Sequence, residues 1–119
     1  MPLWSDPRDA ALVYEMLERM SLIEDLVSGR EEQAFLHDVS LPHALALHFL
    51  VLGETANKLS KSFKAAVPGV EWQKIINLRH LIAHEYRAID HAELWRLCFE
   101  EIPQLKSDLP DLPPPAAIF

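Results

Sequence analysis

Residues 75–86 read Ile75-Ile76-Asn77-Leu78-Arg79-His80-Leu81-Ile82-Ala83-His84-Glu85-Tyr86, a run that sets charged and aromatic side chains inside an apolar repeat. At ~100° per residue, the rotation of an α-helix, one sector roughly 100° wide holds Trp72, Ile75, Ile76, Arg79, Ile82, Ala83 and Tyr86. The pattern predicts a helix over about residues 72–84, with Arg79 in the middle of its apolar stripe.

Arg79 is the main misfit of this predicted helix. Its guanidinium stays charged, so a place in an apolar stripe requires a carboxylate, a phosphate or water from a cleft. One interpretation is a structural ion pair with a carboxylate such as Glu54. The other is a functional site, because residues that break a local rule often mark function.

His84 follows Arg79 by five residues and would point ~140° away from it on an uninterrupted helix. The apolar period stops near His84, and Asp90 opens the next segment. We therefore expect the helix to end at about residues 84–86 and its last turn to loosen, so that His84 turns back toward Arg79 and Tyr86.

The segments before this helix also have helical spacing. Asp6 as N-cap and Pro7 at the first helical position predict a first helix, which should end at Ser28-Gly29. A second, short helix is expected over about residues 30–37.

The third predicted helix starts with Ser40 as its cap, runs to about Ala65 and has two apolar sides. The side that suits a domain core comprises Leu45, Phe49, Leu52, Ala56, Leu59 and Phe63. The other side flanks Glu54 and comprises Leu47, Leu50 and Val51. Because a small bundle has one core, we expect this second side to form a subunit interface.

The whole pattern predicts an all-α protein. Asp90 and Glu93 have capping-box spacing for a last helix, in which Pro103 should cause a kink or the end. The chain has 119 residues, half of them apolar and only three of them glycine. We predict one antiparallel bundle of four to five helices over residues 1–108, followed by a proline-rich extended tail over residues 109–119.

Composition limits the classes of function. The net charge of −7 argues against nucleic-acid binding over the whole surface. The second half still carries Lys58, Lys61, Lys64, Lys74, Arg79 and Arg87, so any RNA contact is expected there. The lone cysteine, Cys98, excludes an internal disulfide and favours a cytosolic protein, and no apolar run approaches the ~20 residues that span a bilayer.

Several motifs together resemble the HepT-like branch of the HEPN superfamily. Arg79, His84 and Tyr86 match its R-x4-H-x-Y signature. The segments 53–59 (Gly-Glu-Thr-Ala-Asn-Lys-Leu), 68–72 (Pro-Gly-Val-Glu-Trp) and 102–105 (Ile-Pro-Gln-Leu), with Trp95, resemble the blocks around that signature. One position differs, because His80 stands where these proteins usually have asparagine.

The resemblance implies a HEPN-type bundle and a metal-independent endoribonuclease, the toxin of a toxin–antitoxin pair. It implies a composite site at a homodimer interface with Arg79 and His84 as catalytic residues. His80, Glu54 and Asn57 are auxiliary candidates, and His80 could supply a second imidazole. The resemblance also implies an MntA-type nucleotidyltransferase antitoxin that transfers AMP to Tyr86.

Other functions remain open at this point. The chain could be a non-catalytic module that binds a nucleotide or serves as the partner of a nucleotidyltransferase, which His80 and the acidic charge favour. It could also be a purely structural helical dimer. His80 and His84 have the i, i+4 spacing of metal ligands, but no third ligand is obvious, so neither a metal nor another cofactor is predicted.

Overall fold

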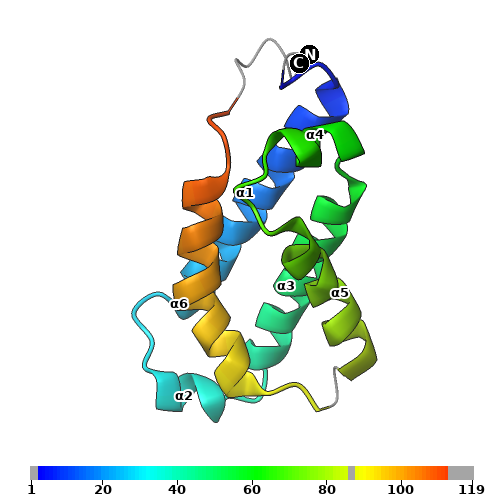
Figure 1. Ribbon diagram of the computed structural model, residues 1–119. Helices are drawn as coiled ribbons and strands as arrows, with labels where there is room; N and C mark the ends of the chain where they lie inside the picture. Colours follow the sequence, from blue (N-terminus) through cyan, green and yellow to red (C-terminus); the bar gives the residue numbers. More distant parts are fainter. Residues whose placement is uncertain (1–2, 86–87, 113–119) are drawn as a thin grey trace.

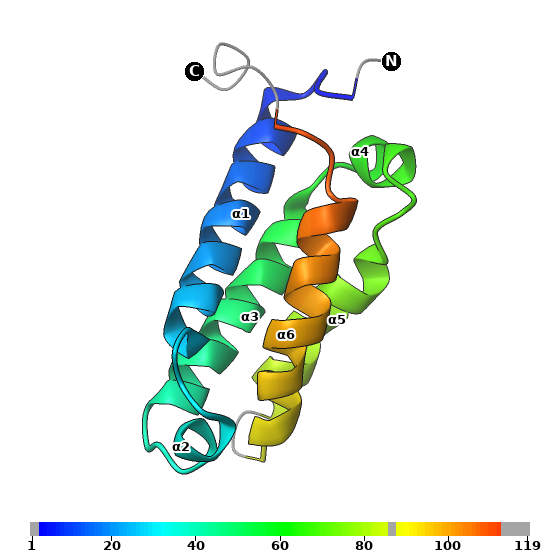
Figure 2. The ribbon, with the colours of Figure 1, turned by 90° about the vertical axis from the view of Figure 1, so that its left-hand side faces the viewer.

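The computed structural model describes residues 3–85 and 88–112, and within these ranges it contains six helices and no strand. They are α1 (Pro7–Val27), α2 (Glu32–Leu36), α3 (Leu41–Lys58), α4 (Lys61–Ala66), α5 (Trp72–Glu85) and α6 (His91–Asp108). The four long helices α1, α3, α5 and α6 run alternately in opposite directions, while α2 and α4 lie at opposite ends (Figures 1 and 2). The predicted all-α antiparallel bundle is confirmed.

Local capping explains where α1 and α6 begin. The carboxylate of Asp6 accepts a hydrogen bond from the backbone N–H of Arg8, and Pro7 starts the helix. The carboxylate of Asp90 accepts from the N–H groups of Ala92 and Glu93. Both predicted starts are therefore confirmed, because an N-cap carboxylate satisfies backbone donors that the first turn leaves free.

The predicted third helix divides in two, contrary to expectation. α3 ends at Lys58, and Ser60 caps α4 by accepting from the N–H of Phe63 at 3.1 Å. The N–H and hydroxyl of Ser60 also donate to the carboxylate of Asp9 on α1, at 2.9 and 2.6 Å. The break is thus stabilised by a carboxylate from a distant part of the chain, and Asp9 is buried in making these bonds.

Two further boundary predictions need correction. The side chain of Ser40 does not cap α3; the carboxylate of Asp38 accepts from the N–H groups of Ser40 and Leu41, both at 2.8 Å. Of the two outcomes predicted at Pro103, a kink or the end of the helix, the end is wrong, because α6 continues to Asp108. The apolar residues on either side of Pro103 are buried in the core, which stabilises the last turn of α6.

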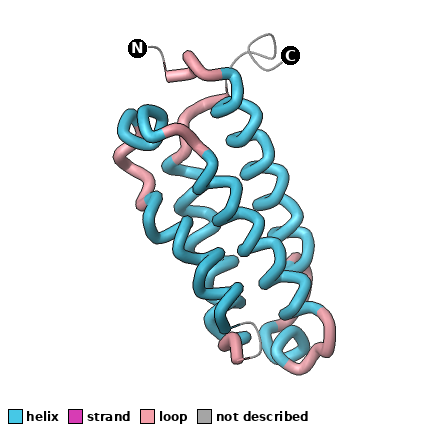
Figure 3. The backbone as a smooth tube through the Cα atoms, turned by 90° about the vertical axis from the view of Figure 1, so that its right-hand side faces the viewer, coloured by secondary structure: helices cyan, strands magenta, loops and turns pink. Residues whose placement is uncertain are grey.

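The long helices lie side by side along the bundle (Figure 3), and the buried apolar side chains of the described residues form one hydrophobic core. All six residues predicted for the core side of the third helix are buried, although Leu59 and Phe63 lie beyond the end of α3: Leu45, Phe49, Leu52, Ala56, Leu59 and Phe63. The ring of Phe63 also packs against Trp4 in a tilted arrangement and against Trp72 edge to face, with ring centroids 5.1 and 6.0 Å away. None of the described helices is long and apolar enough to cross a membrane.

α3 and α5 approach each other closely at Gly53. A Cβ atom added to Gly53 would lie 2.9 Å from the backbone nitrogen of Arg79 and 2.9 Å from the carbonyl oxygen of Ile75. Only a residue without a side chain lets the two backbones approach so closely. This contact fixes the position of the middle of α5 against α3.

Gly53→Ala should therefore destabilise the protein, although Gly→Ala inside an exposed helix stabilises by ~1 kcal/mol. The added methyl group would press on the backbone of α5, and overpacking of this kind costs about 1–3 kcal/mol in the free energy of unfolding. Urea denaturation measures the change. Gly69→Ala is the control, because nothing lies within 4 Å of its added Cβ, and equal stability of the two variants would contradict the prediction.

Candidate functional site

An ion pair between α3 and α5 forms the first part of the candidate site. One terminal nitrogen of Arg79, Nη1, donates to Oε1 of Glu54 at 2.9 Å. The side chains of Arg79 and Glu54 are 37% and 43% exposed, so solvent screens the pair and it contributes only about 0–1 kcal/mol to stability. Its place directly beside Gly53 follows from the close approach of the two helices.

The position of Arg79 differs from the predicted one. The buried residues of α5 are Trp72, Ile75, Leu78 and Ile82, whereas Ala83, predicted within the apolar stripe, is exposed. The buried face is thus rotated relative to the predicted stripe, and Arg79 lies at its margin rather than in its middle. A guanidinium at the margin remains accessible, so Arg79 can reach a phosphate as well as Glu54.

A pair of histidines forms the second part of the site. The rings of His80 and His84 lie 4.2 Å apart between centroids, inclined by 52°. Both residues are exposed, one helical turn apart in the last turns of α5. The pair presents two imidazoles on one face of the helix, and imidazole is the side chain best suited to proton transfer near neutral pH.

The last turn of α5 does not loosen as the sequence suggested. The helix continues through Glu85, so His84 keeps the direction of a regular helix, ~140° from that of Arg79. One chain therefore brings Arg79 together with Glu54, and His84 together with His80. Within the described residues it does not direct Arg79 and His84 to a common point.

The remaining candidates are placed as follows. Asn57 is exposed near the end of α3, and Tyr86 lies outside the described residues. Among the other histidines, His48 binds Nη1 of Arg19 through its Nδ1, at 2.9 Å. Burial and the charge of Arg19 lower the pKa of His48. Its partner lies on α1, so His48 belongs to the contact between α1 and α3 and not to the candidate site.

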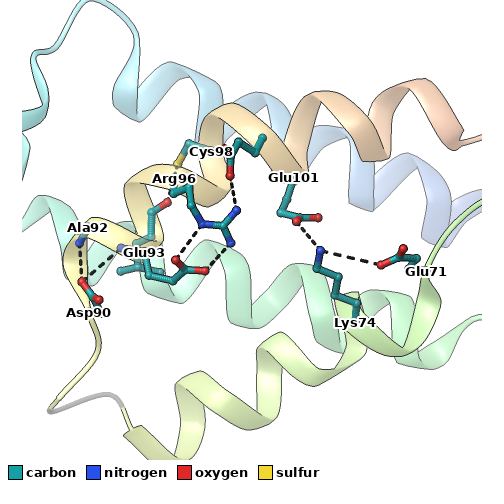
Figure 4. A network of polar contacts seen from close by, with 10 residues as sticks. Glu71, Lys74, Asp90, Ala92, Glu93, Arg96, Cys98 and Glu101 are labelled. Atoms are coloured by element: carbon teal, nitrogen blue, oxygen red, sulfur yellow. Dashed lines mark hydrogen bonds and ion pairs between the residues drawn. The ribbon is translucent and has the colours of Figure 1, made fainter.

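A hollow of about 490 Å³ lies between α5 and α6, away from the histidine pair. Its charged lining residues are Glu71, Lys74, Glu100, Glu101 and Asp108. Lys74 donates to Glu101 and lies 3.9 Å from Glu71 (Figure 4). These bonds raise the pKa of Lys74, chiefly the one to Glu101, and the excess of carboxylates makes this hollow unfavourable for a phosphate chain.

The sequence predicts an RNA contact in the second half of the chain, but the ammonium group of Lys74 is already engaged by carboxylates and is not free to bind a phosphate there.

A second hollow of about 330 Å³ follows along the gap between α5 and α6. Its lining includes the apolar residues Leu81 and Leu97 and the carboxylates of Glu85 and Glu93. Farther along α6, Cys98 is buried, and burial raises the pKa of its thiol to about 12. A thiol that stays protonated is not a nucleophile.

Sequence reasoning missed the residue that positions the ion pair. In the sequence, Gly53 belongs only to one of the family-like blocks, yet its missing side chain sets the distance between α3 and α5. The sequence does contain a signal for this close helix contact. Gly53 is a lone glycine inside an otherwise apolar helix, next to a charged residue, and such a glycine lowers helix stability and usually has a packing reason.

Comparison with known proteins identifies relatives along most of the chain. Residues 16–112 match the family model described as "Ribonuclease HepT-like". A Methanocaldococcus jannaschii protein named "Putative RNase MJ1380" is 23% identical over 99 residues, which cover 83% of this chain and 91% of that protein. A Thermococcus cleftensis protein named "Probable ribonuclease HepT" is 27% identical over 92 residues, which cover 77% and 84%. No solved structure gives a significant match.

Proposed function

The chain belongs to the HepT-like ribonuclease family, and from this premise we propose that it is a metal-independent endoribonuclease, the toxin of a cytoplasmic toxin–antitoxin pair. The observation that carries the proposal is the accessible C-terminal half of α5. There, an arginine that can bind phosphate and two imidazoles that can move protons lie within six residues, 79–84.

The reaction needs three groups. A base takes the proton of the ribose 2′-OH as its oxygen attacks the adjacent phosphorus, a cation stabilises the charged intermediate, and an acid protonates the departing 5′-oxygen. His84 serves as the base or the acid, and Arg79 holds the phosphate oxygens in exchange for Glu54. The products are a 2′,3′-cyclic phosphate and a free 5′-OH.

Two chains complete the site in this proposal. Because α5 is regular through Glu85, one chain directs Arg79 and His84 apart, while a two-fold dimer can set the His84 of each chain near the Arg79 of the other. The outer side of α3 supports such an interface: Leu47 is 58% exposed, and Leu50 and Val51, four and three residues before Glu54, are partly exposed. His80 is the alternative source of a second imidazole.

The proposed antitoxin is an MntA-type nucleotidyltransferase that transfers AMP to the hydroxyl of Tyr86. The added phosphate would carry a negative charge in the segment that directly follows His84. An added negative charge acts here as it does in phosphorylation: it would pair with Arg79 in place of the RNA phosphate, or it would repel the RNA phosphate.

A second candidate function is a non-catalytic partner module of the nucleotidyltransferase. Two observations favour it: Arg79 is engaged by Glu54, and His80 replaces the usual asparagine. In that case Tyr86 would still accept AMP, but the purified protein would not cut RNA.

His84→Ala should lower the rate of RNA cleavage about 10²–10⁴-fold, the usual contribution of a general acid or base. Cleavage of total RNA by the purified protein in excess chelator measures it. His43→Ala, which removes an exposed histidine at the start of α3, is the control and should keep the wild-type rate. Absence of cutting by the well-folded wild type would favour the partner module, and full activity of His84→Ala would remove the assigned role.

Leu47→Asp should convert a dimer into a monomer, because a carboxylate in an apolar interface loses its hydration without a partner. Analytical ultracentrifugation at micromolar concentration measures the mass. Phe99→Asp is a matched control, since Phe99 is 53% exposed on α6 and should leave the dimer intact. A wild-type monomer, or dissociation by Phe99→Asp alone, would count against the interface on α3.

Co-expression with an MntA-type nucleotidyltransferase should add the mass of AMP to the peptide that contains Tyr86. Tandem mass spectrometry locates the modification, and Tyr86→Phe should abolish it, because this variant lacks only the accepting hydroxyl. Modification of Tyr14, which is 41% exposed on α1, in place of Tyr86 would contradict the proposed target.

A further inference from the structure

His80 and His84 form a compact pair of imidazoles at the end of α5. Their ring centroids are 4.2 Å apart, and both residues are exposed. The pair depends on His80, the position at which this chain departs from the usual asparagine, so it is a feature of this sequence within the motif.

Two imidazoles one helical turn apart can chelate a metal ion. Zinc–nitrogen bonds are 2.0–2.1 Å long, so two nitrogens at a tetrahedral zinc ion lie ~3.4 Å apart. Rotation of the two rings about their side-chain bonds can bring ring nitrogens to this separation. The position near the C-terminal end of α5 also favours a cation, because the free carbonyl groups of the last turn carry partial negative charge.

We propose that His80 and His84 bind one divalent transition-metal ion of the type that prefers imidazole, such as Zn²⁺, Ni²⁺ or Cu²⁺, and that the bound ion inhibits the ribonuclease. The inhibitory half rests on the proposed function, in which His84 transfers a proton. A ring nitrogen that binds the metal uses its lone pair, and this lone pair is then no longer available to accept the 2′-OH proton.

The site should be weak and reversible. Among the described residues, no group of three or more histidine, cysteine, aspartate or glutamate side chains could hold a metal ion. Water would therefore fill the remaining coordination positions. Such an ion regulates the exposed end of the helix without contributing to folding, in contrast to structural zinc with four protein ligands.

A second pair of neighbouring histidines, which could also bind a metal ion, lies at another place in the bundle. The rings of His43 and His91 lie 6.0 Å apart, edge to face, where the starts of α3 and α6 meet. This pair is distant in sequence from the signature and provides the matched control for the binding experiment.

The first measurement is a calorimetric titration of the purified full chain with Zn²⁺ alone. His80→Asn and His84→Asn should each weaken binding about 10-fold or more, since loss even of outer-sphere partners of a metal ligand weakens binding 10–100-fold. His43→Asn should bind as the wild type does. Unchanged affinity in His80→Asn, or loss of binding in His43→Asn, would overturn the proposed site.

The second measurement is RNA cleavage over the same Zn²⁺ titration, with recovery by excess chelator. The concentration for half-inhibition of the wild type should equal the dissociation constant from calorimetry, and it should rise about 10-fold or more in His80→Asn. Zn²⁺ binding at the pair without inhibition would overturn the inhibitory role. Failure of the wild type to cut RNA even in chelator would instead refute the proposed function, while calorimetry would still decide the metal site.

Discussion

The close approach of α3 and α5 at Gly53 is the constraint on which the candidate site depends. Because the backbone atoms of Arg79 and Ile75 occupy the space of a side chain at residue 53, α5 has little freedom to rotate or slide on α3. Its buried residues face the core, and Arg79 emerges at the edge of the contact beside Glu54. The ion pair itself is too exposed to hold the helices together. It is a consequence of the packing and not its cause.

The same arrangement separates two chemical environments on the two sides of α5. Toward α6 lie hollows lined by Glu71, Glu101 and Glu93, where Lys74 is already bound to carboxylates (Figure 4). Away from α6 lies the accessible pair of Arg79 and Glu54. For an acidic protein with a net charge of −7, this separation matters, because a phosphate chain avoids the carboxylate-lined gap and is left with the face of Arg79.

The features that the sequence predicts well are local. The caps Asp6 and Asp90 bind N–H groups within three residues, and the core stripe of α3 follows from its own spacing. The features it misses depend on distant residues. Ser60 starts a new helix because Asp9 on α1 accepts two hydrogen bonds from it, and Arg79 leaves the centre of the stripe because Gly53 lies against its backbone. Neither partner can be identified from the period of a single segment.

Because α5 stays helical to its end, one chain alone does not bring Arg79 and His84 together. A loosened last turn would have allowed one chain to join Arg79 and His84, whereas the helix continues through Glu85 and directs them ~140° apart. Under the proposed function, a second chain supplies the missing group. Leu50 and Val51 precede Glu54 by four and three residues, a spacing that puts them on its face of α3, and both are partly exposed, so a copy that covers them would also lie beside the guanidinium of Arg79. Under the proposed function, the surface that joins two chains and the surface that binds phosphate are therefore adjacent, and dimerisation and activity should be lost together.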